Sequence, residues 1–131
     1  TQISINLGGC VIPIALSIYL FSNSTLTLSS TLLGVAMISG ISYFFSRPVQ
    51  GFGIGMPIMI APISAALVSL LISPEQSAPL AYISGTLGVL IGADLLRLKD
   101  ISKLGTPYAS IGGAGTFDGI FITGIVAALL V

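Results

Sequence analysis

Charged residues are almost absent from the first 93 residues of this chain. No Asp, Glu, Lys or Arg occurs in residues 1–46, 48–74 or 76–93, and charged residues make up only 6% of the whole sequence. Soluble domains carry about 25% charged residues, and the mean hydropathy here is +1.10. A helical membrane span needs about 20 mainly apolar residues. The composition therefore predicts a multi-pass membrane protein.

Turn-forming residues divide the chain into five expected spans. Ser22–Thr25 ends the first span, and Arg47-Pro48 ends the second because proline disfavours a helical residue before it. Ser73–Ser77 ends the third, and a polar hinge over Arg97–Lys103 separates the last two. The spans are expected at about 7–21, 28–46, 55–72, 79–98 and 108–131.

The expected fold is an all-α membrane helix bundle that forms one transmembrane domain over residues 1–131. Glycines and prolines predict kinked or broken helices near Gly51–Pro62 and Gly112–Asp118. Because the chain starts at Thr1 without a methionine, we also expect an upstream segment before it.

The basic residues predict an orientation. Arg47 lies between the second and third spans, and Arg97, Lys99 and Lys103 lie between the fourth and fifth. These two loops share a side if five spans alternate, and basic loops favour the cytoplasmic side. We expect a cytoplasmic-membrane protein whose amino terminus is inside and whose carboxyl terminus is outside.

The residue inventory excludes several kinds of chemistry. The chain has no histidine and one cysteine, Cys10, which leaves no Ser–His or Cys–His pair and no zinc, haem or iron–sulfur ligand set. We therefore expect no metal and no cofactor. The net charge of zero gives no support for nucleic-acid binding. The glycine-rich segments Gly51–Gly55 and Gly112–Gly115 lack the lysine of a phosphate loop, and we expect neither to follow a strand.

Two aspartates, Asp94 and Asp118, lie in otherwise apolar segments. An ionisable group in hydrocarbon costs about 2.5–3.5 kcal/mol on insertion scales and usually marks a pathway or a reaction centre. The fourth and fifth spans are consecutive and antiparallel, and Asp118 lies about ten residues into the last one, so we expect the two carboxyls to face each other. Two close carboxyls share one proton, and one can then act as a base on water.

This pair predicts an intramembrane aspartyl hydrolase whose partners are the lipid bilayer and a membrane-embedded peptide substrate. The sequence leaves the oligomeric state open, and a homo-oligomer is compatible with it. The residues expected to support the site or to line its cavity are Asn6, Arg47, Gly92, Gly115 and Thr116.

Other interpretations remain open at this point. Asp94 could pair with Arg97 at i+3, and Asp118 could cap a half-helix that restarts after it. Both carboxylates could instead carry protons or a cation in a small transporter or channel. A structural or lipid-binding role is the third interpretation.

Four strings are similar to one known family: Ile5-Asn6-Leu7-Gly8-Gly9, Arg47-Pro48-Val49-Gln50-Gly51, Gly92-Ala93-Asp94-Leu95-Leu96 and the segment from Ser110 to Phe121. The chain resembles, over nearly its whole length, an uncharacterised family of bacterial and archaeal multi-pass membrane proteins. That resemblance implies a prokaryotic membrane protein and brings no established activity.

A looser likeness connects the chain to the presenilin and prepilin-peptidase class of intramembrane aspartyl proteases. Gly92-Ala93-Asp94 and Gly115-Thr116-Phe117-Asp118 approximate the Gly-x-Gly-Asp motif of that class. The Pro-Ala-Leu element of the presenilins is absent. This likeness implies catalytic roles for Asp94 and Asp118.

Overall fold

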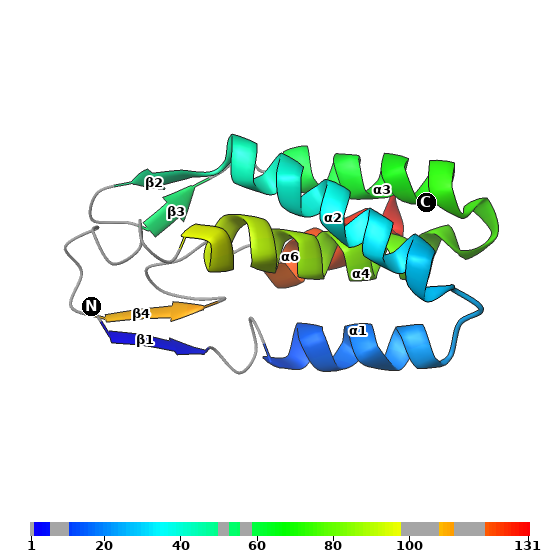
Figure 1. The fold of residues 1–131 in the computed structure, drawn as a ribbon, viewed down its shortest axis with the longest axis horizontal. Helices are drawn as coiled ribbons and strands as arrows, with labels where there is room; N and C mark the ends of the chain where they lie inside the picture. Colours follow the sequence, from blue (N-terminus) through cyan, green and yellow to red (C-terminus); the bar gives the residue numbers. More distant parts are fainter. Residues whose placement is uncertain (1, 6–10, 50–52, 56–58, 98–107, 112–119) are drawn as a thin grey trace.

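Five α-helices make up most of the chain that the computed structural model describes, which is residues 2–5, 11–49, 53–55, 59–97, 108–111 and 120–131. They lie side by side, and each runs opposite to the one before it (Figure 1). This arrangement confirms the expected helix bundle. The helices are α1 (Ile12–Ser22), α2 (Leu28–Phe45), α3 (Ile60–Ile72), α4 (Ser77–Val89) and α6 (Ile120–Leu129).

Four short strands accompany the helices, and the sequence analysis did not expect them. β1 (Gln2–Ile5) pairs in parallel with β4 (Tyr108–Ile111), and β2 (Arg47–Val49) pairs antiparallel with β3 (Gly53–Gly55). Both pairs lie at the same end of the bundle (Figure 1). Tyr108–Ile111 was expected to begin the last helical span, and this expectation is wrong because the segment is extended.

The strands also correct the interpretation of the two glycine-rich segments. Gly53–Gly55 is itself strand β3 and follows strand β2, and Gly112 directly follows β4. The expectation that neither segment follows a strand is therefore wrong. The lysine of a phosphate loop is still absent from both segments.

A break in the chain near Gly51–Pro62 was expected, and the structure has one. The β2–β3 hairpin stands where the third helix was expected to begin, and α3 starts only at Ile60. Pro62 lies in the first turn of α3, where the backbone N–H groups have no partner within the helix and a proline is tolerated. The second expected break, near Gly112–Asp118, lies outside the described residues.

Helix α4 occupies the centre of the bundle. A short 3₁₀ turn, η2 (Pro74–Gln76), leads into it, and it continues through a π-helical turn, η3 (Leu90–Asp94), into a 3₁₀ turn, η4 (Leu95–Arg97). It contacts α1, α2, α3 and α6. Nine of its thirteen residues are buried. The other helices therefore pack mainly around α4.

Glycines let the neighbouring helices approach α4 closely. A Cβ atom added to Gly88 would lie 2.6 Å from the Ile38 Cβ on α2, closer than real Cβ atoms come. Gly85 faces Ala65 of α3, and a Cβ there would lie 3.3 Å from the Ala65 Cβ. Such small-residue contacts are typical of helix packing in membranes. They set the spacing between α4 and its neighbours.

The bundle has an apolar core that includes Ile38, Leu80 and Ile83, and it also buries hydroxyl-bearing residues, among them Ser42, Ser69 and Thr86. Many other large apolar residues are exposed on its surface. Leu71 and Leu129 are 83% and 79% exposed. Within the described residues one helix, α2, is both long and apolar enough to cross a membrane, and α1 and α3 are shorter apolar helices.

Replacing Gly88 by alanine should destabilise the bundle, because the new methyl group would overlap Ile38. Overpacking of this kind costs about 1–3 kcal/mol. Gly40 is the matched control: it lies inside α2, and an added Cβ meets nothing within 4 Å. Gly40→Ala should be neutral or should stabilise by up to about 1 kcal/mol through helix propensity. Thermal unfolding of both variants in detergent, followed by circular dichroism, measures the difference, and equal effects would contradict the close α2–α4 contact.

Candidate functional site

Asp94 ends the π-helical turn at the carboxyl end of α4. The Leu95 N–H donates to the carbonyls of both Leu90 and Ile91, five and four residues earlier, which defines the wider turn. Single π-helical turns inside α-helices are rare and occur frequently at functional sites. The backbone therefore singles out the segment that carries the first candidate aspartate.

Gly92 lies within this turn and packs against α2. A Cβ atom on Gly92 would overlap the Ser39 carbonyl oxygen and would lie 2.9 Å from the Ser42 Cβ. Only a residue without a side chain fits here. Gly92 therefore holds the turn that ends at Asp94 against the backbone of α2.

Helix α6 packs along α4 in the opposite direction (Figure 1). Gly85 faces Thr123 and Ala127, and a Cβ on Gly124 would lie 3.0 Å from Tyr82 Cε2. At the other end of the pair, Ile120 belongs to the same buried cluster as Val89, Leu90 and Ala93. The first described residue of α6 and residues of the π-helical turn therefore belong to one apolar core, which also includes Ala81 and Ala127.

The remaining expected site residues divide into two groups. Arg47 is the first residue of β2 and pairs with Gly55, at the end of the bundle where α4 also ends (Figure 1). The others, Asn6, Gly115, Thr116 and Asp118, lie outside the described residues. Asp118 precedes Ile120 by two positions in the sequence.

Four buried hydroxyl groups were missed by sequence reasoning. Ser42 Oγ and Ser69 Oγ have no hydrogen-bond partner among the described residues, whereas the Tyr82 hydroxyl is hydrogen-bonded to the Thr86 side chain. An unpaired buried polar group costs about 1–3 kcal/mol. Hydroxyl residues are common in apolar helices and often bond to their own helix, so their spacing in the sequence gave no signal.

Other buried hydroxyls in the bundle bond to their own helix, which makes the unpaired ones distinctive. Ser39 Oγ donates to the Val35 carbonyl and Ser84 Oγ to the Leu80 carbonyl, both at 2.7 Å. Tyr82 and Thr86 lie one turn apart on α4, beside Gly124 of α6. Ser42 of α2 lies beside Gly92. An unpaired hydroxyl is thus present beside the π-helical turn, and a hydrogen-bonded pair of hydroxyls lies in the α4–α6 contact.

The described part of the chain has no group of three or more His, Cys, Asp or Glu residues that could hold a metal ion. The chemistry available to the described residues is therefore that of a carboxylate segment and of buried hydroxyls. Both occur along α4 and its contacts with α2 and α6.

The bundle combines buried hydroxyl-bearing residues with many exposed large apolar side chains, and one of its described helices is long and apolar enough to cross a membrane. The chain belongs to the DUF1614 family, a family of proteins of unknown function, which it matches over residues 1–130. This match confirms the resemblance to an uncharacterised family. No curated protein and no solved structure matches the chain, and the likeness to presenilin-type and prepilin-peptidase-type proteases is not supported.

A disulfide should form between cysteines at positions 85 and 127, which would verify the alignment of α4 with α6. A Cβ atom on Gly85 would lie 3.6 Å from the Ala127 Cβ, within the range that disulfides require. In a Cys10→Ser background, the Gly85→Cys/Ala127→Cys variant should lose about 2 Da on mild oxidation, the mass of the two hydrogens released when the S–S bond forms.

The matched control for the disulfide pairs Gly85→Cys with Leu129→Cys, because Leu129 is 79% exposed and faces away from the bundle. This control should remain reduced under the same conditions. Oxidation of the control pair and not of the 85/127 pair would contradict the antiparallel packing on which the site depends.

Proposed function

We propose that this protein is an integral membrane aspartyl hydrolase in which Asp94 and Asp118 form a catalytic pair. The observation that supports the pairing best is the packing of α4 against α6. Leu90 and Ala93, in the π-helical turn that ends at Asp94, belong to the same buried apolar cluster as Ile120. Ile120 lies two positions after Asp118 in the sequence. Two carboxyls brought together in an apolar setting share a single proton.

The proposed reaction uses both protonation states of the pair. The ionised carboxyl takes a proton from a water molecule, and the water oxygen attacks the carbonyl carbon of the peptide bond. The protonated carboxyl hydrogen-bonds to the carbonyl oxygen and stabilises the tetrahedral intermediate. Proton transfer to the leaving nitrogen then breaks the C–N bond and gives a carboxyl and an amine. The proposed substrate is a membrane-embedded peptide.

Placement in a bilayer is supported by helix length as well as by the apolar surface. The 18 residues of α2 extend over about 27 Å at about 1.5 Å per residue, close to the hydrocarbon thickness of about 30 Å. The consecutive helical segments from Ser77 to Arg97 extend over roughly 30 Å by the same measure. We propose that all five helices are membrane spans. The residues next to the shorter helices would complete the path of the chain across the bilayer.

The two strand pairs are compatible with this placement. Backbone that is not helical is tolerated at membrane depth only where its polar groups are paired and where it is buried in protein or lines a cavity. β1 pairs with β4, and β2 pairs with β3. Broken helices of this kind also occur around the binding sites of transporters.

Charge placement supports the proposed orientation. Arg47 begins β2 and Arg97 ends η4, at the end of the bundle that carries the strands, whereas Glu75 lies in η2 at the opposite end (Figure 1). Basic loops favour the cytoplasm. We therefore propose that the strand end is cytoplasmic and that the protein lies in the cytoplasmic membrane.

The unpaired hydroxyls favour a second candidate function, a small proton- or cation-coupled transporter or channel. Ser42 and Ser69 offer oxygen atoms inside the bundle that no described residue satisfies. Water or a cation that entered the bundle would find these oxygens as partners. In this alternative Asp94 and Asp118 would be coupling groups rather than catalysts.

Asp118→Asn distinguishes the two functions, because it removes the charge with almost no change of shape. For a hydrolase, we expect peptide cleavage in proteoliposomes to fall by about 10²–10⁴-fold, the usual contribution of a general acid or base. Asp94→Asn should have the same effect, and a transition-state mimic of the aspartyl class should bind the parent but neither variant. Glu75→Gln, at the opposite end of the bundle, is the matched control and should retain full activity.

The same variants test the alternative. For a transporter, neither parent nor variant would cleave peptides, and pH- or cation-dependent flux would be lost in Asp118→Asn. If Asp118→Asn left both cleavage and flux unchanged, both proposed functions would be wrong and Asp118 would be structural.

Single cysteines should report the orientation, because a membrane-impermeant thiol reagent labels only the side it can reach. In a Cys10→Ser background, Gln76→Cys in η2 should be labelled in intact cells, and Phe45→Cys at the end of α2, a position that is 41% exposed, should be labelled only after the membrane is opened. The reverse pattern would overturn the proposed orientation. Labelling of both sites in intact cells would contradict the bilayer placement itself.

A further inference from the structure

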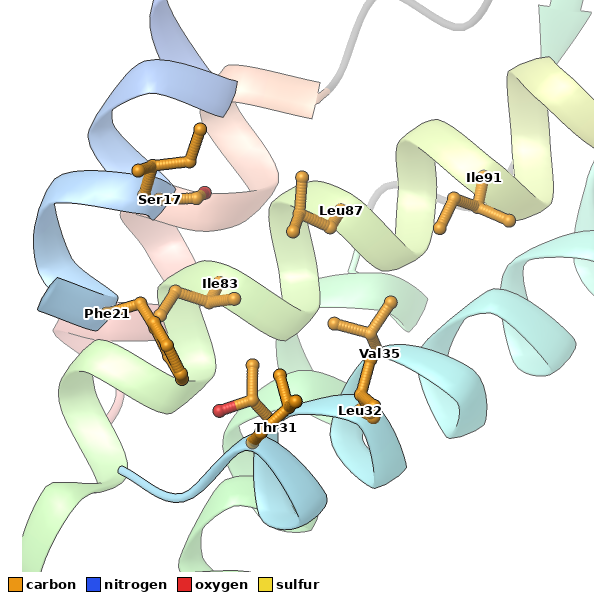
Figure 2. A pocket seen from close by; sticks show the side chains of 10 residues that line it. Ser17, Phe21, Thr31, Leu32, Val35, Ile83, Leu87 and Ile91 are labelled. Carbon is orange, nitrogen blue, oxygen red and sulfur yellow. The ribbon is translucent and has the colours of Figure 1, made fainter. Parts of the chain in front are cut away.

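A groove opens along one side of the bundle between α1, α2 and α4. Helix α4 contributes Ile83 and Leu87 to its floor, the π-helical turn η3 contributes Ile91, and Phe21 and Val35 line its two sides (Figure 2). The groove encloses about 310 Å³. This volume is at the lower end of the range of about 300–1,000 Å³ that is usual for small-molecule sites.

The lining of the groove has no unpaired polar group with which an occupant would need to form a hydrogen bond. Its only hydroxyl residues are Ser17 and Thr31, and both donate to a carbonyl of their own helix. Ser17 Oγ donates to the Pro13 carbonyl at 2.9 Å, and Thr31 Oγ1 donates to the Thr27 carbonyl at 2.9 Å. All other lining side chains are hydrocarbon. An occupant that fits must therefore be apolar along its length.

The size of the groove restricts the occupant further. The floor from Ile83 to Ile91 extends over about 12 Å at about 1.5 Å per residue, close to half of the bilayer's hydrocarbon thickness of about 30 Å. A groove of this length and volume fits a thin, flexible hydrocarbon chain.

We propose that this groove binds one acyl chain of a bilayer phospholipid. The rim residues Ile18 and Leu32 are 62% and 57% exposed, so in the proposed bilayer placement the groove opens toward the lipid and an acyl chain can enter from the side. The inner end of the floor is Ile91, which lies in the π-helical turn three residues before Asp94. The bound chain thus packs against the segment that carries the candidate carboxylate.

Tryptophan fluorescence tests this proposal, since the chain has no native tryptophan. Leu32→Trp places a reporter on the rim, and Leu71→Trp places one on α3, at a residue that is 83% exposed and does not line the groove. Each purified variant is titrated in detergent with phosphatidylcholine that carries bromine on one acyl chain. Quenching of Leu32→Trp should saturate at about one lipid per chain, and quenching of Leu71→Trp should rise without saturation.

A groove-filling variant supplies the second comparison. Val35→Phe, added to the Leu32→Trp background, should weaken the saturable quenching at least tenfold, because the larger ring occupies the groove. Val126→Phe on α6 is the matched control and should leave the quenching unchanged, since Val126 does not line the groove. If Val35→Phe fails to fold, Leu87→Phe repeats the test from the floor of the groove.

Several outcomes would overturn the proposal. These are equal, non-saturable quenching at both reporters, saturable quenching that persists in both filling variants, or a dimer in which a second copy excludes lipid from the Leu32→Trp reporter. The inference rests on the proposed bilayer placement and not on catalysis. Extraction of membranes with alkaline carbonate tests that placement separately: release of the protein would remove the bilayer, whereas retention without saturable quenching would refute the lipid site alone.

Discussion

The close approach of four helices to α4 is the interaction on which the rest of the structure depends. Gly88 and Gly92 admit the backbone of α2, and Gly85 admits side chains of α3 and α6. In the proposed bilayer the hydrophobic effect would not hold the helices together, so close van der Waals packing would have to do so. Glycines make that packing dense where α2, α3 and α6 meet α4.

The same packing determines where chemistry can occur. α4 changes from α-helical to π-helical geometry at Leu90, within the region where Gly92 meets Ser39 and Ser42 of α2. The turn ends at Asp94, and α6 returns along the other side of α4 with Ile120 in the same buried cluster. The proposed catalytic pair and the proposed acyl-chain groove thus depend on one helix, whose carboxyl-terminal turn adjoins both.

Parts of the fold that follow from local sequence were predictable. The uncharged run before Arg47 and the turn at Ser22–Thr25 predicted a helix over 28–46, and α2 is Leu28–Phe45. The fourth expected span, 79–98, agrees with the helical segments from Ser77 to Arg97.

The strands were missed because β1 and β4 are far apart in the sequence, and parallel pairing between distant segments leaves no local signal beyond alternation over four residues. Of the site, the sequence could single out Asp94, Asp118 and Gly92, because a charge or a glycine is conspicuous in an apolar helix. It could not identify the unpaired hydroxyls of Ser42 and Ser69, because only the packed bundle determines which hydroxyls lack a partner.

The distance between the carboxyl carbons of Asp94 and Asp118 is the most direct test of the central claim. The chain has only three aspartates, so in an Asp100→Asn variant that carries ¹³C only at the aspartate carboxyls, solid-state NMR recoupling in lipid vesicles measures a single distance. We expect a strong dipolar contact, because a shared proton requires direct hydrogen bonding or one bridging water, whose two bonds together extend over about 6 Å. A separation of more than about 10 Å, beyond that reach, would contradict the catalytic pair.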